Sequence, residues 1–224
     1  ARDYLVPSRN HPGEFFALAA FHKGFEHPIQ KFVFPTTGTY ELRPMNGDSG
    51  RLYGWEAECR LSAVNLWKAF DWALYLGDVP GSMLRWSVVA NYSRVASEVR
   101  RDSVSGTRVT IPFTGQSPYS TNLGLFYASR KRKLESGLLY KTFGKRLDAY
   151  GSNVLGNIYE YPPESLDFTL SYGLTRSSRL KFSAENLLDS PTLFRQSGHV
   201  TQRYTEGTSI GLSVSYQPAS SEEE

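Results

Sequence analysis

The stretch LDFTLSYGLTRSSRLKFSAENLLD, residues 166–189, decides the fold class because it repeats a two-residue pattern twice. Apolar residues occupy every second position from Leu166 to Leu174, and the alternation resumes from Leu180 to Ala184 after the polar turn at 175–178. Two alternating runs joined by a short turn predict an antiparallel hairpin with one apolar and one polar face. Such a hairpin fits two settings: a protein core opposite water, or lipid opposite a polar lumen.

The composition narrows the class of protein. The chain has 224 residues, of which 14% are aromatic and 21% charged, and its mean hydropathy is −0.40. No run of about 18 apolar residues occurs, so no transmembrane helix is predicted, although alternating membrane strands also average out as polar. The net charge of +3 comes from scattered basic residues and gives no support for nucleic acid as a partner. The single Cys59 and the dispersed histidines lack metal-ligand spacing, so no metal or cofactor is expected.

Alternation along the chain predicts an all-β fold, an antiparallel meander of about nine long strands. The expected strands are 15–23, 29–42, 52–63, 84–96, 119–129, 134–143, 166–174, 179–185 and 208–216, with Pro35 and Gly38 interrupting the second. Most are about ten residues long, which exceeds the usual soluble strand and matches a tilted membrane-crossing strand. The remaining expectations are a loop at 1–13, a helical or compact insert at 65–82, and an acidic disordered tail at 218–224. Residues 1–217 would then form one partial transmembrane β-barrel.

The turns and the aromatic residues favour the membrane setting. Short turns at 25–28, 130–133 and 175–178 contrast with long polar loops at 43–50, 100–118, 147–164 and 189–206. Aromatic side chains lie on the apolar faces, several of them near strand ends: Trp55, Trp86, Tyr92, Tyr119, Tyr127, Tyr140, Tyr172 and Tyr216. One-sided long loops and aromatic girdles are typical of an outer-membrane barrel. The alternative is a soluble β-sandwich binding module with an aromatic core, which would need no detergent.

In the membrane setting, the two faces of the opening hairpin have different partners. The apolar residues, among them Phe168, Tyr172 and Phe182, are expected to contact outer-membrane lipid. Asp167, Lys181 and Glu185 are expected to line a lumen, as alternate positions do in a membrane barrel.

Ordered motifs along the chain carry a family resemblance. They are FFALAAFHKGFEHPI (15–29), GWEAECR (54–60), ANYS (90–93), GQSPYSTNLGLFY (115–127), FSAENLLD (182–189) and IGLSVSY (210–216). Together they resemble the C-terminal barrel portion of a TonB-dependent outer-membrane receptor, and GQSPYSTNLGLFY is the most specific match.

The resemblance implies a bacterial outer-membrane protein that takes up a scarce nutrient with energy from the inner-membrane TonB system. It implies a barrel of about 22 strands. The missing strands and the plug domain, which this chain lacks, would belong to the same parent protein or to a second chain. The alternative is a structural split-barrel subunit of an outer-membrane complex, without transport activity.

Candidate ligand contacts are chosen only because they lie in the long loops. They are Tyr150, Asn153, Tyr159, Tyr161, Arg195, Gln196 and His199. The motifs do not identify a substrate.

An enzyme is not expected. Glu56 and Glu58 share one strand face, but cross-strand pairing with basic residues such as Arg179 is the simpler role for them. Ser117 lacks the context of a nucleophile elbow, so no catalytic residue is predicted.

Overall fold

The computed structural model describes residues 2–5, 14–74, 77–78, 80–102, 108–129, 133–151 and 155–217. Its strands are β1 (Arg2–Leu5), β2 (Phe15–Glu26), β3 (Ile29–Thr36), β4 (Thr39–Asn46), β5 (Ser49–Ser62), β6 (Trp86–Asp102), β7 (Arg108–Ile111), β8 (Tyr119–Ser129), β9 (Leu134–Phe143), β10 (Arg146–Gly151), β11 (Ile158–Tyr161), β12 (Ser165–Gly173), β13 (Ser178–Glu185), β14 (Thr192–Gln196), β15 (His199–Tyr204) and β16 (Ser209–Tyr216). The helical segments are α1 (Ala63–Leu74) and the short 3-10 helix η1 (Gly81–Arg85). The tail expected at 218–224 lies outside the described residues. Within the described ranges, no helix has the length and apolar character needed to cross a membrane.

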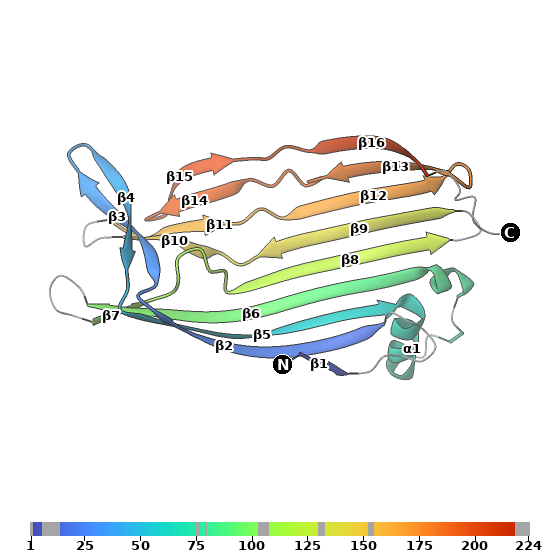
Figure 1. The fold of residues 1–224 in the computed structure, drawn as a ribbon, viewed down its shortest axis with the longest axis horizontal. Coiled ribbons are helices and arrows are strands. Elements are labelled where there is room, and N and C mark those ends of the chain that lie inside the picture. Colours follow the sequence, from blue (N-terminus) through green and yellow to red (C-terminus); the bar gives the residue numbers. More distant parts are fainter. Residues whose placement is uncertain are drawn as a thin grey trace.

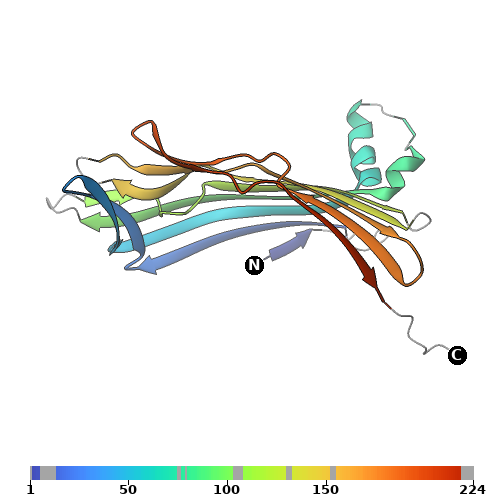
Figure 2. The same cartoon turned by 90° about the horizontal axis from the view of Figure 1, so that it is seen from above.

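The larger sheet is an antiparallel meander, as the alternation predicts. Its neighbours run β1-β2-β5-β6-β8-β9-β12-β13-β16, with β7 added to β6 (Figure 1). The opening hairpin is confirmed, since β12 and β13 pair Tyr172 with Leu180 and Leu170 with Phe182. The sheet is arched rather than closed, and β1 and β16 form its two edges (Figure 2).

Strand register carries the two-residue alternation across the whole meander. Leu123 is in register with Ala90 on one side and Tyr140 on the other, whereas the adjacent Asn122 is in register with Asn91 and Lys141. Residues in register share a face, so the sheet has one apolar face and one polar face. The apolar side chains are exposed, and cross-strand ion pairs such as Lys141–Asp167 (2.8 Å) lie on the polar face.

Aromatic clusters bound the apolar face at both ends. The rings of Trp86 and Tyr127 lie 5.1 Å apart near the short turns, and Tyr92 lies 5.3 Å from Trp55 and 6.3 Å from Tyr119 at the other end. Tyr119 and Tyr127 are eight positions apart on β8, which is about 26 Å along the strand. A strand tilt of about 40° converts this length to roughly 20 Å of height, close to the ~25 Å apolar band of an outer-membrane barrel.

The segment 29–42 differs from the prediction of a long strand in the meander. It belongs to the hairpin β3–β4, which turns at Gly38 with a φ of +80°. Pro35 donates no backbone hydrogen bond, and glycine enters the left-handed region without strain, so the chain reverses here.

Because β3 and β4 pair with each other, the neighbour of β2 differs from the one expected in the predicted meander. β2 pairs with β5, and the short turn at 27–28 lies at the opposite end from the β8–β9 and β12–β13 turns. The predicted loop at 1–13 is also wrong over β1, which pairs with β2 and forms the first strand of the meander.

The predicted long loops contain further strands. At one end of the meander a second sheet, called here the loop sheet, has the order β15-β14-β11-β10-β3-β4 (Figure 1). Its parallel β10–β3 pair sets Tyr150 against Phe32, from segments far apart in the chain. Phe32 packs with Val99 of β6 and Ile111 of β7, all at most 6% exposed, and this cluster joins the loop sheet to the larger sheet, which is called here the wall.

α1 and η1 occupy the connection from β5 to β6, at the end opposite the loop sheet. The interval 65–82, expected to hold a helical or compact insert, therefore contains most of α1 and the start of η1.

Candidate ligand site on the loop sheet

The structure brings six of the seven candidate residues into the loop sheet, and the seventh, Asn153, lies outside the described residues. β10 carries Tyr150, β11 carries Tyr159 and Tyr161, β14 carries Arg195 and Gln196, and β15 carries His199. These four strands are consecutive neighbours, so residues from two separate predicted loops share one sheet.

Two cations stack on two tyrosine rings on one face of this sheet. The Nζ of Lys145 lies 4.2 Å from the ring centroid of Tyr159 and 5.1 Å from that of Tyr161, and the Cζ of Arg195 lies 5.0 Å from the Tyr161 centroid. Arg195 is in register with Tyr159, which places it on the same face. Lys145, Tyr159, Tyr161 and Arg195 are called here the cation–aromatic cluster. The ring quadrupoles attract both cations without neutralising their charge.

Both cations of the cluster remain available to a ligand. Across the described residues neither forms an ion pair, and the Nε of Arg195 is buried with no hydrogen-bond partner. The nearby carboxylate of Glu160, in a residue that is 7% exposed, is bound by Arg146 through Nε (2.6 Å) and Nη2 (2.8 Å). Glu160 alternates with Tyr159 and Tyr161 along β11 and therefore faces the other way. Two cations beside aromatic rings suit a small anionic ligand, especially one with a flat ring.

The other candidates have packing or hydrogen-bonding roles. The Tyr150 ring lies edge-on to Phe32 at 5.5 Å and belongs to the cluster that joins the loop sheet to the wall. Gln196 donates from Nε2 to the Gly156 carbonyl oxygen at 2.8 Å, and His199 is exposed at the turn between β14 and β15.

Lys145 was not among the candidates. It lies in the two-residue link between β9 and β10, just before the range of the predicted long loop, and its contact with the rings of β11 depends on the pairing of β10 with β11.

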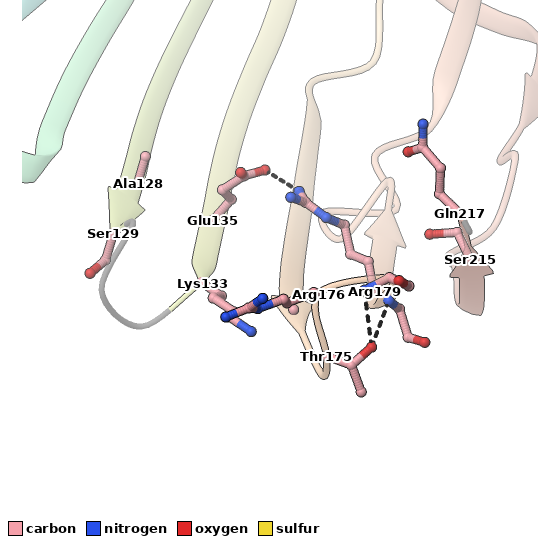
Figure 3. A pocket seen from close by; sticks show the side chains of 12 residues that line it. Ala128, Ser129, Lys133, Glu135, Thr175, Arg176, Arg179, Ser215 and Gln217 are labelled. Carbon is pink, nitrogen blue, oxygen red and sulfur yellow. Dashed lines mark hydrogen bonds and ion pairs between the residues drawn. The ribbon is translucent and has the colours of Figure 1, made fainter. Parts of the chain in front are cut away.

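A hollow of 520 Å³ lies on the polar face at the short-turn end (Figure 3). The β8–β9 and β12–β13 turns border it with Lys133, Arg176 and Arg179. Arg179 is neutralised by Glu135 at 2.7 Å. Thr175 Oγ1 accepts hydrogen bonds from two backbone N–H groups and stiffens the turn. The hollow is cationic but lies at the far end of the wall from the cation–aromatic cluster.

Carboxylate pairing differs from the expectation. Glu56 and Glu58 lie on the polar face of β5, in register with Ser93 and Asn91, whereas Arg179 pairs with Glu135. In the part of the chain that the structure describes, no group of three or more His, Cys, Asp or Glu residues is arranged to hold a metal ion.

Comparison with known proteins adds two findings. The family model described as "TonB dependent receptor-like, beta-barrel" matches residues 9–187. Among solved structures, the crystal structure of the ferric-catecholate import receptor Fiu from K12 E. coli, in its closed form, matches with a TM-score of 0.53 and 16% identity. The match covers 91% of this chain and 25% of that chain, so this chain spans about a quarter of the length of Fiu. At this identity the likeness shows the fold alone. No curated protein sequence matches the chain.

Proposed function

The chain belongs to the TonB-dependent receptor-like β-barrel family, and from that premise we propose that it forms part of the wall and of the external ligand site of an uptake receptor. The family is an outer-membrane family of transporters and receptors that work with TonB, and it is not an enzyme family. The observation that carries the proposal is the two-faced sheet. Its apolar face leaves Leu123 45% exposed between two aromatic clusters, and Ile210 and Leu212 of the edge strand β16 each 72% exposed, a surface that lipid solvates and water does not.

The cation–aromatic cluster is the proposed ligand contact. It lies on the loop sheet, at the end of the wall away from the short turns, which is the external end of an outer-membrane barrel. Lys145 and Arg195 supply positive charge, and Tyr159 and Tyr161 supply ring faces. A catecholate, the ligand class named for Fiu, combines an aromatic ring with negative charge. That class fits the cluster, and we propose it as the substrate class to test first.

The test uses the complete receptor that contains this chain, with a ferric catecholate as the probe. Lys145→Ala and Arg195→Ala should each weaken binding roughly tenfold, since a charge-assisted contact contributes about 1.5 kcal/mol. Arg43→Ala is the matched control, because Arg43 is another cation of the loop sheet but is already paired with Glu41 at 2.7 Å. Unchanged binding in the double variant Lys145→Ala/Arg195→Ala would refute the cluster as the ligand contact. Absence of the receptor from the outer-membrane fraction would refute the proposal that the chain forms part of the wall of an outer-membrane barrel.

The open edges at β1 and β16 also fit a second candidate, a structural split-barrel subunit without transport. Each unpaired backbone group in lipid costs several kcal/mol, so either function requires further strands from the same protein or from a second chain. The uptake receptor also requires a plug. If the further strands and a plug domain copurify with this chain and the complex shows TonB-dependent uptake, the receptor is supported. If they copurify and the complex shows no uptake, the structural subunit is supported.

A further inference from the structure

We propose that α1 and η1 form an amphipathic anchor that lies in the lipid interface at the short-turn end of the wall. Phe70 and Leu74 of α1 and Leu84 of η1 would insert between the lipid chains. The anchor goes beyond the uptake function and depends on it only in that the wall crosses a membrane.

The first observation is an apolar strip on α1 that no other described part of the chain covers. Leu66, Phe70 and Leu74 are spaced four residues apart, so they lie along one side of the helix. Phe70 is 56% exposed and Leu74 is 62% exposed, whereas Val64, on a different side, is 7% exposed. The exposed polar residue Lys68 lies two positions from Phe70, which places it about 160° around the helix. α1 is thus amphipathic with its apolar strip facing outward.

Specific contacts hold α1 in this orientation. The buried carboxylate of Glu14 accepts hydrogen bonds from the Ser62 backbone N–H at 2.5 Å and from Asn65 Nδ2 at 2.6 Å. After the helix, Trp67 Nε1 donates to the Gly77 carbonyl oxygen at 3.0 Å, and Asp71 accepts the Gly77 N–H at 2.9 Å. Both ends of α1 are therefore tied down, and the outward strip is a defined surface.

The η1 segment that follows α1 joins the apolar face of the wall. Arg85 of η1 donates from Nη1 to the Tyr127 hydroxyl at 3.4 Å, and the ring of the adjacent Trp86 lies 5.1 Å from that of Tyr127, tilted by 59°. Trp86 and Tyr127 form the aromatic cluster at the short-turn end of the apolar face. Figure 2 shows α1 on the convex side of the arch, the side that faces outward when such a sheet closes into a barrel.

Lipid is the occupant that this position favours. Leu84 of η1, two residues before Trp86 of the aromatic cluster, adds another apolar side chain that is 70% exposed. Lys68 and Arg85 are cations on long side chains, which suit lipid phosphates when a helix lies in the interface plane. A partner protein or a second copy of the chain would instead need to reach the outer surface at the depth that the lipid headgroups occupy.

The test places spin labels in the complete receptor, reconstituted in phospholipid vesicles, with Cys59 replaced by serine. Labels at Phe70→Cys and Leu74→Cys report the strip, Lys68→Cys reports the polar side of the helix, and Leu123→Cys reports the wall. Because the Phe70 and Leu74 side chains are largely exposed, cysteine there removes little buried packing. Collision with oxygen, which concentrates in lipid, is compared with collision with a water-soluble nickel chelate.

We expect the oxygen-to-nickel ratio at Phe70 and Leu74 to exceed that at Lys68 by roughly fivefold or more and to approach the ratio at Leu123. A water-like ratio at Phe70 and Leu74 beside a lipid-like ratio at Leu123 refutes the anchor and leaves the wall intact. Low collision with both reagents at Phe70 and Leu74 shows a protein cover and also refutes the anchor. A water-like ratio at Leu123 refutes the wall itself.

Discussion

Leu123→Arg tests whether the apolar face of the wall lies in lipid. Leu123 is four positions from Tyr119 and four from Tyr127 on β8, so it lies about 13 Å along the strand from each aromatic cluster. Its side chain is 45% exposed on the apolar face. An arginine on the lipid face at the bilayer midplane costs about 2–4 kcal/mol, and we expect the free energy of unfolding to fall by that amount.

Two matched variants separate membrane depth from general damage. Asn91→Arg adds the same side chain on the polar face at the same depth, since Ala90 is in register with Leu123, and Asn91 has Glu58 and Asn122 beside it. Its cost should stay within about 1 kcal/mol. Leu125→Arg lies two positions nearer to Tyr127, so its cost should fall between those of the other two variants.

Denaturant unfolding of the reconstituted receptor, followed by tryptophan fluorescence, measures these differences. Equal costs for Leu123→Arg and Asn91→Arg would show that the apolar face does not contact lipid. A larger cost for Asn91→Arg would mean that the two faces are assigned the wrong way round. A receptor that stays monodisperse without detergent would favour the soluble sandwich.

Two further predictions concern the loop sheet. Arg146→Met leaves the buried Glu160 carboxylate without its partner, so it should destabilise β10 and β11 by about 3–5 kcal/mol. The double variant Arg146→Met/Glu160→Met should recover most of the lost stability. Hydrogen exchange of the β11 amides measures the stability of both variants. Similar protection in the wild type and Arg146→Met would contradict the pairing. The hydrogen bond from Arg43 lowers the pKa of the exposed Glu41. The contact therefore stabilises the β3–β4 hairpin at pH values above the ordinary carboxyl pKa. This stabilisation is lost as the pH falls through the lowered pKa and Glu41 becomes protonated. Hydrogen exchange in the hairpin should therefore depend more on acid pH in the wild type than in Glu41→Gln, and an identical dependence in both would rule the contact out as a stabiliser.

The cation–aromatic cluster was partly predictable. Tyr159, Tyr161 and Arg195 stood out as aromatic and basic residues in long polar segments between wall strands. Lys145 did not, because its contact depends on the pairing of β10 with β11. The separation of Tyr150 from the cluster also depends on tertiary structure, since a parallel pairing with β3 sets it against Phe32.

The sequence by itself determined which face of the wall each residue occupies. Alternation is a local property, because successive side chains of a strand point to opposite sides, and so the β12–β13 hairpin and the bounds of β8 and β9 follow from short stretches. Only the tertiary structure decided which strands lie side by side. β2 pairs with β5 because β3 and β4 close on each other, and the four- to six-residue strands β10, β11, β14 and β15 carry too few periods to be recognised alone. Their pairing depends on contacts between distant segments, which a local pattern does not encode.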